Sequence, residues 1–471
     1  MASSANRTLA WAGLAATVLS GTAWWFGTGL HPQAWLTWLA PLPLLLLAPR
    51  LRWHHAALAA LVAGACAGLN LWHYLIDVIG LPLPVGVIAA LAPAATFALA
   101  LLLFRRLWLV RRYAAAAMGF PALWVAVDFV SFSGSPHGTF GSLAYSQLDV
   151  LPFVQFASVA GIWGVAFLLL LAPAALAIGV LPGPDRRERL RVAGATCLLF
   201  VSVFKYGFAR LDRQEADSLR VGLVSIPGPL RPAMLSADGQ VILKRYLAAI
   251  DTLAERGAQV VVVPETVIAT DQAAIAEFAD SAARNKVTIA AGIAVKDAAR
   301  GQRNTALAFV PGAAEPVIYA KHHLIPGVED HYQAGADYAM LPGTRTGLAV
   351  CKDMDFHDTG RAYSDRMAKL LLVPAWDFGV DGRMHSRMAV MRGIESGFAV
   401  ARAALRGNLT LSDNRGRIIA EKSDDFGDAT LIGEVPLYDS LTLYARLGDW
   451  FAWLALAMLG AAVLASRGAR D

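Results

Sequence analysis

The pattern of apolar positions divides the chain into a part with long apolar runs and a part with short ones. A membrane-spanning helix needs about 20 mostly apolar residues. We predict eight such helices, seven in the first part of the chain and one close to its end, at 8–27, 34–49, 56–80, 86–110, 114–132, 153–182, 191–208 and 447–466. We therefore expect an N-terminal transmembrane domain at 1–212, a separate domain at 213–446, and a C-terminal transmembrane helix with a tail at 447–471.

Short apolar runs alternate with helical patterns in the 213–446 segment. The runs typical of strands are 220–226, 259–265, 287–295, 305–310, 345–351, 368–376 and 397–405, and the helical patterns are 237–256, 271–285 and 382–396. Nearly continuous apolar strands are typical of sheets that are buried on both faces. The stretch 411–419 also predicts a hairpin with its turn at Asn414–Gly416. The segment therefore has the pattern of an α/β domain.

Composition and charge support a membrane protein. The chain has 56% hydrophobic and 16% charged residues, whereas soluble domains usually have about 25% charged residues. The formal net charge of +5 would suit a nucleic-acid partner, but the cations cluster at alternate ends of successive apolar runs, so we predict no nucleic acid. Under the positive-inside rule this places both termini in the cytoplasm and residues 213–446 outside it.

The cysteines and histidines do not indicate a disulfide framework or a metal site. Two of the three cysteines, Cys66 and Cys197, lie inside long apolar stretches. The pairs His54–His55 and His322–His323 have no third ligand at a suitable spacing. We predict no metal and no cofactor.

Three polar residues follow apolar strands, and together they could perform nucleophilic acyl chemistry. Glu265 follows "VVVVP", Lys321 follows "PVIYA", and Cys351 closes "RTGLAV". A thiol is mostly protonated at neutral pH, so it needs a base or a nearby cation. Glu265 could be the base, and Lys321 could stabilise the thiolate and an oxyanion. From spacing alone, the alternatives of a solvated turn, a surface lysine and a core cysteine stay open.

The stretches around these residues resemble a known family. "VVPET" at 262–266, "YAKHHLIP" at 319–326 and "GLAVCKDMDF" at 347–356 are similar to the Glu, Lys and Cys blocks of the nitrilase, or carbon-nitrogen hydrolase, superfamily. Seven preceding spans and one following span resemble its membrane-bound branch, the apolipoprotein N-acyltransferase family. The resemblance implies an αββα sandwich outside the cytoplasm, with Glu265 as base, Lys321 as the oxyanion partner and Cys351 as nucleophile.

Further residues match the family less closely. Asn304 in "RNTALAF" falls where the superfamily has an Asn-Ser or Asn-Thr pair, and Glu329 falls where the family has a second glutamate near the lysine. Asp353 stands where the family has glutamate after the cysteine. Trp376 in "PAWDFG" resembles a tryptophan that would lie on a mobile flap near the acyl entry.

The resemblance implies a two-step reaction at the outer face of the bacterial inner membrane. The cysteine takes an acyl chain from a phospholipid as a thioester, and the α-amine of a lipoprotein's diacylglyceryl-cysteine then receives it. The expected partners are a phospholipid donor, a diacylated lipoprotein acceptor and the membrane, with the protein acting as a monomer.

Departures from the family pattern leave other functions open. Lys352 stands where the family has tyrosine, and 224–232 and 402–408 differ from the family's usual runs. Lys352 could add a second cation near Cys351 or point away from it. One alternative is a different amine acceptor or an amidase, in which water attacks the thioester. The other is a lipid-binding scaffold with an inactive triad.

Overall fold

The computed structural model describes residues 2–212, 217–297, 301–425 and 427–467. The chain divides into two compact units. The first comprises 1–133, 141–211 and 449–471, and the second comprises 134–140 and 212–448. Residues 134–140, which fall inside the predicted transmembrane domain, therefore belong to the second unit.

The first unit is helical. Within the described residues, six of its helices are long and apolar enough to cross a membrane. They are α1 (Ala2–Gly27), α5 (Leu83–Leu109), α6 (Tyr113–Ser133), α8 (Ala157–Val180), α9 (Arg186–Leu211) and α15 (Trp450–Arg467). Six of the eight predicted spans therefore form helices of sufficient length.

The other two predicted spans form shorter helices. The stretch 34–49 folds as α2 (Ala34–Leu39) and α3 (Leu42–Leu47), which are separated at Pro41. Proline lacks a backbone N–H and interrupts the hydrogen bonds of a helix. The stretch 56–80 contains the 17-residue α4 (Trp53–Leu69), followed by the π-helix η1 (Tyr74–Val78). The count of eight membrane spans stays a prediction.

The second unit contains two sheets. The six-stranded sheet has the order β11-β1-β2-β3-β4-β5, and the five-stranded sheet has the order β10-β9-β8-β7-β6. The first sheet is built from β1 (Asp217–Ser225), β2 (Val260–Thr270), β3 (Thr288–Asp297), β4 (Gly301–Phe309), β5 (Val317–Ala320) and β11 (Ala429–Leu437). The second is built from β6 (Thr346–Leu348), β7 (Leu370–Trp376), β8 (Ala399–Leu405), β9 (Asn408–Ser412) and β10 (Ile418–Ser423).

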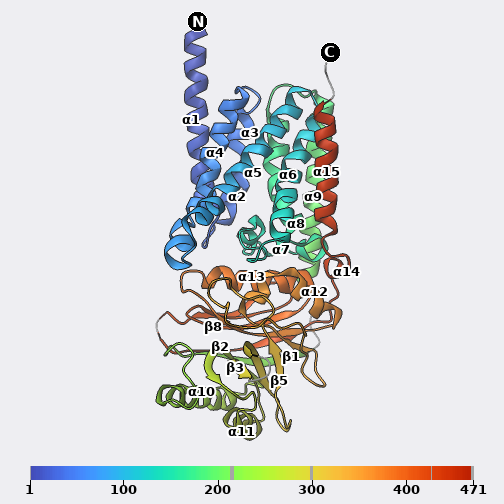
Figure 1. Cartoon of the computed structure of the whole chain (residues 1–471). Coiled ribbons are helices and arrows are strands. Elements are labelled where there is room, and N and C mark those ends of the chain that lie inside the picture. Colours follow the sequence, from blue (N-terminus) through green and yellow to red (C-terminus); the bar gives the residue numbers. More distant parts are fainter. Residues whose placement is uncertain (1, 213–216, 298–300, 426, 468–471) are drawn as a thin grey trace. The chain divides into compact units, whose positions relative to one another are not determined.

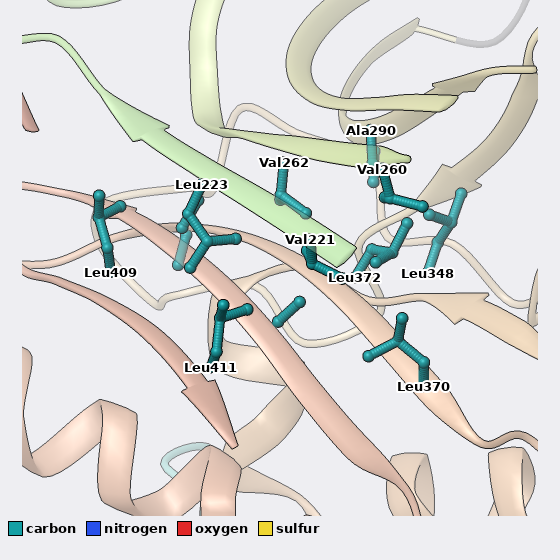
Figure 2. Packing of buried hydrophobic residues seen from close by; sticks show 14 of the residues in the cluster. Val221, Leu223, Val260, Val262, Ala290, Leu348, Leu370, Leu372, Leu409 and Leu411 are labelled. Atoms are coloured by element: carbon teal, nitrogen blue, oxygen red, sulfur yellow. The ribbon is translucent and has the colours of Figure 1, made fainter. Parts of the chain in front are cut away.

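The two sheets pack face to face around an apolar core. Figure 2 shows this core, in which Val221, Val262 and Ala290 of the first sheet meet Leu372 and Leu411 of the second. Apolar side chains from both strand faces are buried because burial of apolar surface is the main favourable contribution to folding.

Helices cover the outer faces of both sheets. The first sheet packs against α10 (Ala237–Glu255) and α11 (Ala276–Asn285), and the second against α12 (His357–Asp365) and α13 (Gly382–Ser396). Figure 1 shows α10 and α11 on one side of the strands and α12 and α13 on the other. The unit is therefore an αββα sandwich, as predicted.

The predicted elements agree with the observed ones apart from their ends. The predicted hairpin is confirmed, since β9 and β10 pair antiparallel across the turn that contains Gly416. The strand predicted to end at Cys351 is shorter, because β6 ends at Leu348 and Cys351 begins the 3-10 helix η3 (Cys351–Asp355). Cys351 therefore lies on a turn just beyond the sheet.

Replacement of Leu372 by alanine tests the importance of the core between the sheets. Leu372 is fully buried, and such truncations cost about 2 to 5 kcal/mol because they leave a cavity. We expect Leu372→Ala to lower the unfolding midpoint of the purified protein in detergent. The matched change Ile318→Ala, at a position that is 53% exposed, should leave the midpoint near that of the wild type. Equal midpoints for both variants would contradict this assignment of the core.

Candidate active site

Glu265 lies where the pairing of two parallel strands is interrupted. The register between β2 and β3 shifts between Val263 and Ile268, and Thr266 within this bulge has a φ of 48°. Opposite the bulge is Gly292, where a Cβ atom would lie 2.3 Å from the Cα of Glu265. Glycine at 292 therefore allows the bulge to approach β3 closely.

Lys321 connects Glu265 to a second carboxylate. It directly follows β5, and its side chain has no exposed surface. Its Nζ lies 2.8 Å from Oε1 of Glu265 and 2.8 Å from Oε2 of Glu329. The Nδ2 group of Asn304 donates to Oε1 of Glu265 at 2.5 Å and to Oε1 of Glu329 at 2.6 Å. The two carboxylates thus share one ammonium and one amide.

Burial and this pairing determine the protonation of the three groups. Burial raises the pKa of Glu265, and Lys321 only partly opposes that rise. Burial acts to lower the pKa of Lys321, but the two carboxylates hold it well above its usual value. Burial likewise acts against ionisation of Glu329, yet Lys321 keeps the pKa of that carboxyl below its usual range. Lys321 and Glu329 are therefore charged, and Glu265 is the group suited to exchange a proton.

Cys351 is buried at the first position of η3. It is 7% exposed, has a φ of 43°, and directs its thiol to the carbonyl oxygen of Trp376 at 3.3 Å. Burial raises the pKa of the thiol well above its usual value, the charge of Glu265 raises it further, and the charge of Lys321 lowers it. Glu265, Lys321 and Cys351 are thus all buried, and the charges of Glu265 and Lys321 both act on the thiol.

Asp353 links the segment that follows Lys321 to the turn that carries Cys351. Its Oδ1 accepts hydrogen bonds from the backbone N–H groups of His322 and His323, at 3.1 Å and 2.9 Å. Its Oδ2 accepts from the hydroxyl of Tyr319 at 2.8 Å and from the N–H of Val350 at 3.1 Å. This single carboxylate therefore fixes the segment after β5 relative to the turn of Cys351.

Trp376 is the last residue of strand β7, and its backbone pairs with Leu405 of β8. Its ring lies 4.9 Å from the ring of Phe378. The position in a sheet differs from the predicted mobile flap, because strand pairing fixes the backbone at this residue. Trp376 nevertheless lies beside the thiol through its carbonyl oxygen.

A buried ion pair that the sequence analysis missed also acts on Cys351. Arg402 of β8 donates to both carboxylate oxygens of Asp377, at 2.8 Å and 2.5 Å. The charge of Arg402 lowers the pKa of the thiol, and that of Asp377 raises it. An arginine inside the otherwise apolar run "FAVARAAL" was the available signal, since a buried charge needs a partner.

A second buried network lies at Asp355, the last residue of the turn. Nδ1 of His385 lies 3.3 Å from Oδ1 of Asp355, and its Nε2 lies 3.3 Å from Oδ2 of Asp381. Burial acts to lower the pKa of His385, but the two carboxylates raise it to about 10. His385 is therefore a buried cation.

Comparisons with known proteins agree with this fold. Residues 220–441 match the carbon-nitrogen hydrolase family, and residues 10–175 match the apolipoprotein N-acyltransferase N-terminal domain. The apolipoprotein N-acyltransferase of Azotobacter vinelandii is 30% identical over 430 residues, which cover 81% of this chain and 79% of that protein. The protein of the same name from Geobacter metallireducens is 28% identical over 491 residues, which cover 93% and 91%.

A solved structure also aligns with part of this chain. The Saccharomyces cerevisiae member of branch 10 of the nitrilase superfamily aligns with 47% of this chain at 18% identity and a TM-score of 0.42.

The sandwich and its buried Glu, Lys and Cys cluster define a nitrilase-type domain in a chain with apolar helices. The chain belongs to the apolipoprotein N-acyltransferase family. The match to this family confirms the resemblance found in the sequence. The relatives and the apolar helices indicate a bacterial membrane protein.

The raised pKa of His385 predicts a pH dependence of stability. The folded-state pKa of about 10 lies above the usual value of 6.5, so this histidine contributes stability that is complete below pH 6.5 and is lost as the pH rises towards 10. We expect His385→Asn to flatten the fall of the thermal midpoint between pH 6.5 and pH 10, measured by unfolding in detergent. The matched change His331→Asn, at an exposed histidine, should leave the pH profile of the wild type unchanged. An unchanged pH profile in His385→Asn would contradict the charged state of His385.

Proposed function

We propose that the protein transfers a fatty acyl chain from a phospholipid, through a thioester on Cys351, to the α-amine of the N-terminal diacylglyceryl-cysteine of lipoproteins. The observation that carries this proposal is the buried cluster of Glu265, Lys321 and Cys351 in a chain of this family. Both expected substrates are lipids, which accounts for the apolar helices of the first unit.

In the first step the Cys351 sulfur attacks the ester carbonyl of the phospholipid. The thiol proton passes to Glu265 as the carbon–sulfur bond forms, and the negative charge on the carbonyl oxygen is stabilised by the Lys321 ammonium. The ester carbon–oxygen bond then breaks, and Glu265 returns the proton to the departing lysophospholipid. Oxyanion stabilisation of this kind is worth about 3 to 4 kcal/mol per donor.

In the second step the lipoprotein amine attacks the thioester. The carbon–nitrogen bond forms, the carbon–sulfur bond breaks, and the amine proton passes through Glu265 to the Cys351 sulfur. A thioester retains the acyl-transfer potential of an ester, so a ping-pong sequence divides one difficult reaction into two easier ones.

The supporting residues have positioning roles in this proposal. Glu329 is the second carboxylate that holds the Lys321 ammonium, at 2.8 Å. Asp353 fixes the turn of Cys351 against the lysine segment. Trp376 orients the thiol through its carbonyl oxygen.

We further propose that the catalytic domain faces the extracytoplasmic side of the inner membrane and that both termini are cytoplasmic. The alternation of basic clusters supports this orientation under the positive-inside rule. The protein acts on both substrates as a monomer in this proposal.

Mass spectrometry of the purified protein tests the reaction. After incubation with phospholipid, we expect an added acyl mass on the Cys351 peptide. A diacylated lipopeptide should then remove that mass while a triacylated product forms. An acyl mass that disappears in water without such a product would indicate a hydrolase, and failure of any acylation would favour an inactive scaffold.

Variants separate the roles of the triad from effects on folding. Glu265→Gln should slow acylation by about 100- to 10,000-fold, the usual contribution of a general base, while thermal stability in detergent shows whether the protein still folds. Cys351→Ser should carry no thioester mass. The matched change Cys197→Ser alters a cysteine of α9 in the first unit and should leave acylation unchanged.

A further inference from the structure

The loop 134–140 lies against the turn that carries Cys351. Both the N–H and the hydroxyl of Thr139 donate to the backbone oxygen of Asp355, at 3.1 Å and 2.9 Å. Gly138 has a φ of 57°, and a Cβ atom there would lie 2.5 Å from the same oxygen. The ring of Phe140 stacks on that of His385 at 6.0 Å. A loop that lies more than two hundred positions earlier in the sequence therefore packs tightly on the end of η3.

His137 of this loop binds Lys352, the residue next to the nucleophile. Nδ1 of His137 lies 3.3 Å from Nζ of Lys352, and the Lys352 side chain is only 7% exposed. The same Nζ lies 3.8 Å from Oδ2 of Asp355, an oxygen without a hydrogen-bond partner among the described residues. Lys352 therefore points into the protein between an imidazole and a carboxylate.

The protonation of these groups follows from burial and charge. Burial, and then the charge of Lys352, lower the pKa of His137 to about 4. The imidazole is therefore neutral, so its Nδ1 can accept a hydrogen bond from the ammonium. Burial lowers the pKa of Lys352, while Asp355 opposes that change and favours the charged form.

The charges near the thiol leave negative groups in excess. The ion pairs of this centre include six buried carboxylates, Glu265, Glu329, Asp353, Asp355, Asp377 and Asp381, and five cations, Lys321, Lys352, His323, His385 and Arg402. A thiolate at Cys351 adds one more negative charge to this set. Removal of any cation therefore disfavours the thiolate, and Lys352 is the cation that directly follows Cys351 in the chain.

We propose that His137 and Lys352 form a positioning pair, in which loop 134–140 holds the Lys352 ammonium at the cysteine turn so that its charge stabilises the Cys351 thiolate. This inference rests on the proposed role of Cys351 as nucleophile. It assigns to the active centre a residue from the loop between α6 and the 3-10 helix η2 (Leu143–Gln147).

The pH dependence of Cys351 alkylation tests the pair. The full-length protein in detergent is treated with iodoacetamide from pH 6 to pH 11, and mass spectrometry follows the Cys351 peptide. We expect Lys352→Met to raise the midpoint by about one pH unit and to slow alkylation at pH 7.5 by about tenfold. Lys352→Arg retains the charge and should stay within about twofold of the wild-type rate.

The His137 variants test the contribution of the loop. His137→Ala should shift the midpoint in the same direction as Lys352→Met, and His137→Gln should restore most of it because the amide oxygen can accept the hydrogen bond. The double variant His137→Ala/Lys352→Met should have the midpoint of Lys352→Met alone. The effects of two substitutions at residues that act through one contact do not add. Lys422→Met, at an exposed lysine of β10, removes a charge of the same sign and should leave the profile unchanged.

Three results would overturn the proposal. The first is a wild-type midpoint in Lys352→Met, and the second is equal loss in Lys352→Arg and Lys352→Met, which would indicate packing rather than charge. The third is a wild-type profile in His137→Ala. Because alkylation needs neither phospholipid nor acceptor, failure of the proposed acyl transfer in the mass experiment stays distinguishable from failure of the pair.

Discussion

The Lys321 ammonium has no exposed surface and lies 2.8 Å from each of two carboxylates, and the active centre is organised around this contact. A buried ammonium is costly unless charged and polar partners replace the lost water. Glu265 and Glu329 supply these partners from two separate segments of the chain, and Asn304 donates to both carboxylates. Loss of one partner of such a pair typically costs about 3 to 5 kcal/mol. Of these two carboxyls, Glu265 is the one with a raised pKa, because its burial outweighs the opposing charge of Lys321.

Much of the architecture was predictable from the periodicity of apolar residues. Strands buried on both faces are nearly continuous in the sequence, so β1, β2, β3 and β7 were expected close to their observed positions. The ends of elements were less predictable, since they depend on local backbone geometry. The apolar run through Val350 continues past the sheet because the turn of Cys351 is itself buried. Pro41 divides an apolar stretch whose composition alone is typical of one helix.

The candidate triad was predictable because its three residues stand at the ends of apolar runs in recognisable motifs. Its charged surroundings were not, because they come from residues that are distant in sequence. Nothing near His137 indicates that it meets Lys352, and only the fold brings the loop to the turn. Lys352 is buried, and its Nζ lies 3.8 Å from Oδ2 of Asp355. Arg402 stands inside an apolar strand, and its pairing with Asp377 becomes evident only from the neighbouring strand end.

The bulge at Glu265 places a sequence constraint on a residue with no chemical group of its own. Gly292 faces the backbone of Pro264 and Glu265 so closely that any side chain there would meet main-chain atoms, which cannot move aside as a flexible side chain can. A substitution at 292 would therefore displace the carboxyl from Lys321 while all three triad residues stay intact. In a survey of single substitutions across the chain, position 292 would group with the catalytic residues although it carries no reactive atom. Intolerance to mutation in this fold thus marks the support of the active centre as well as its chemistry.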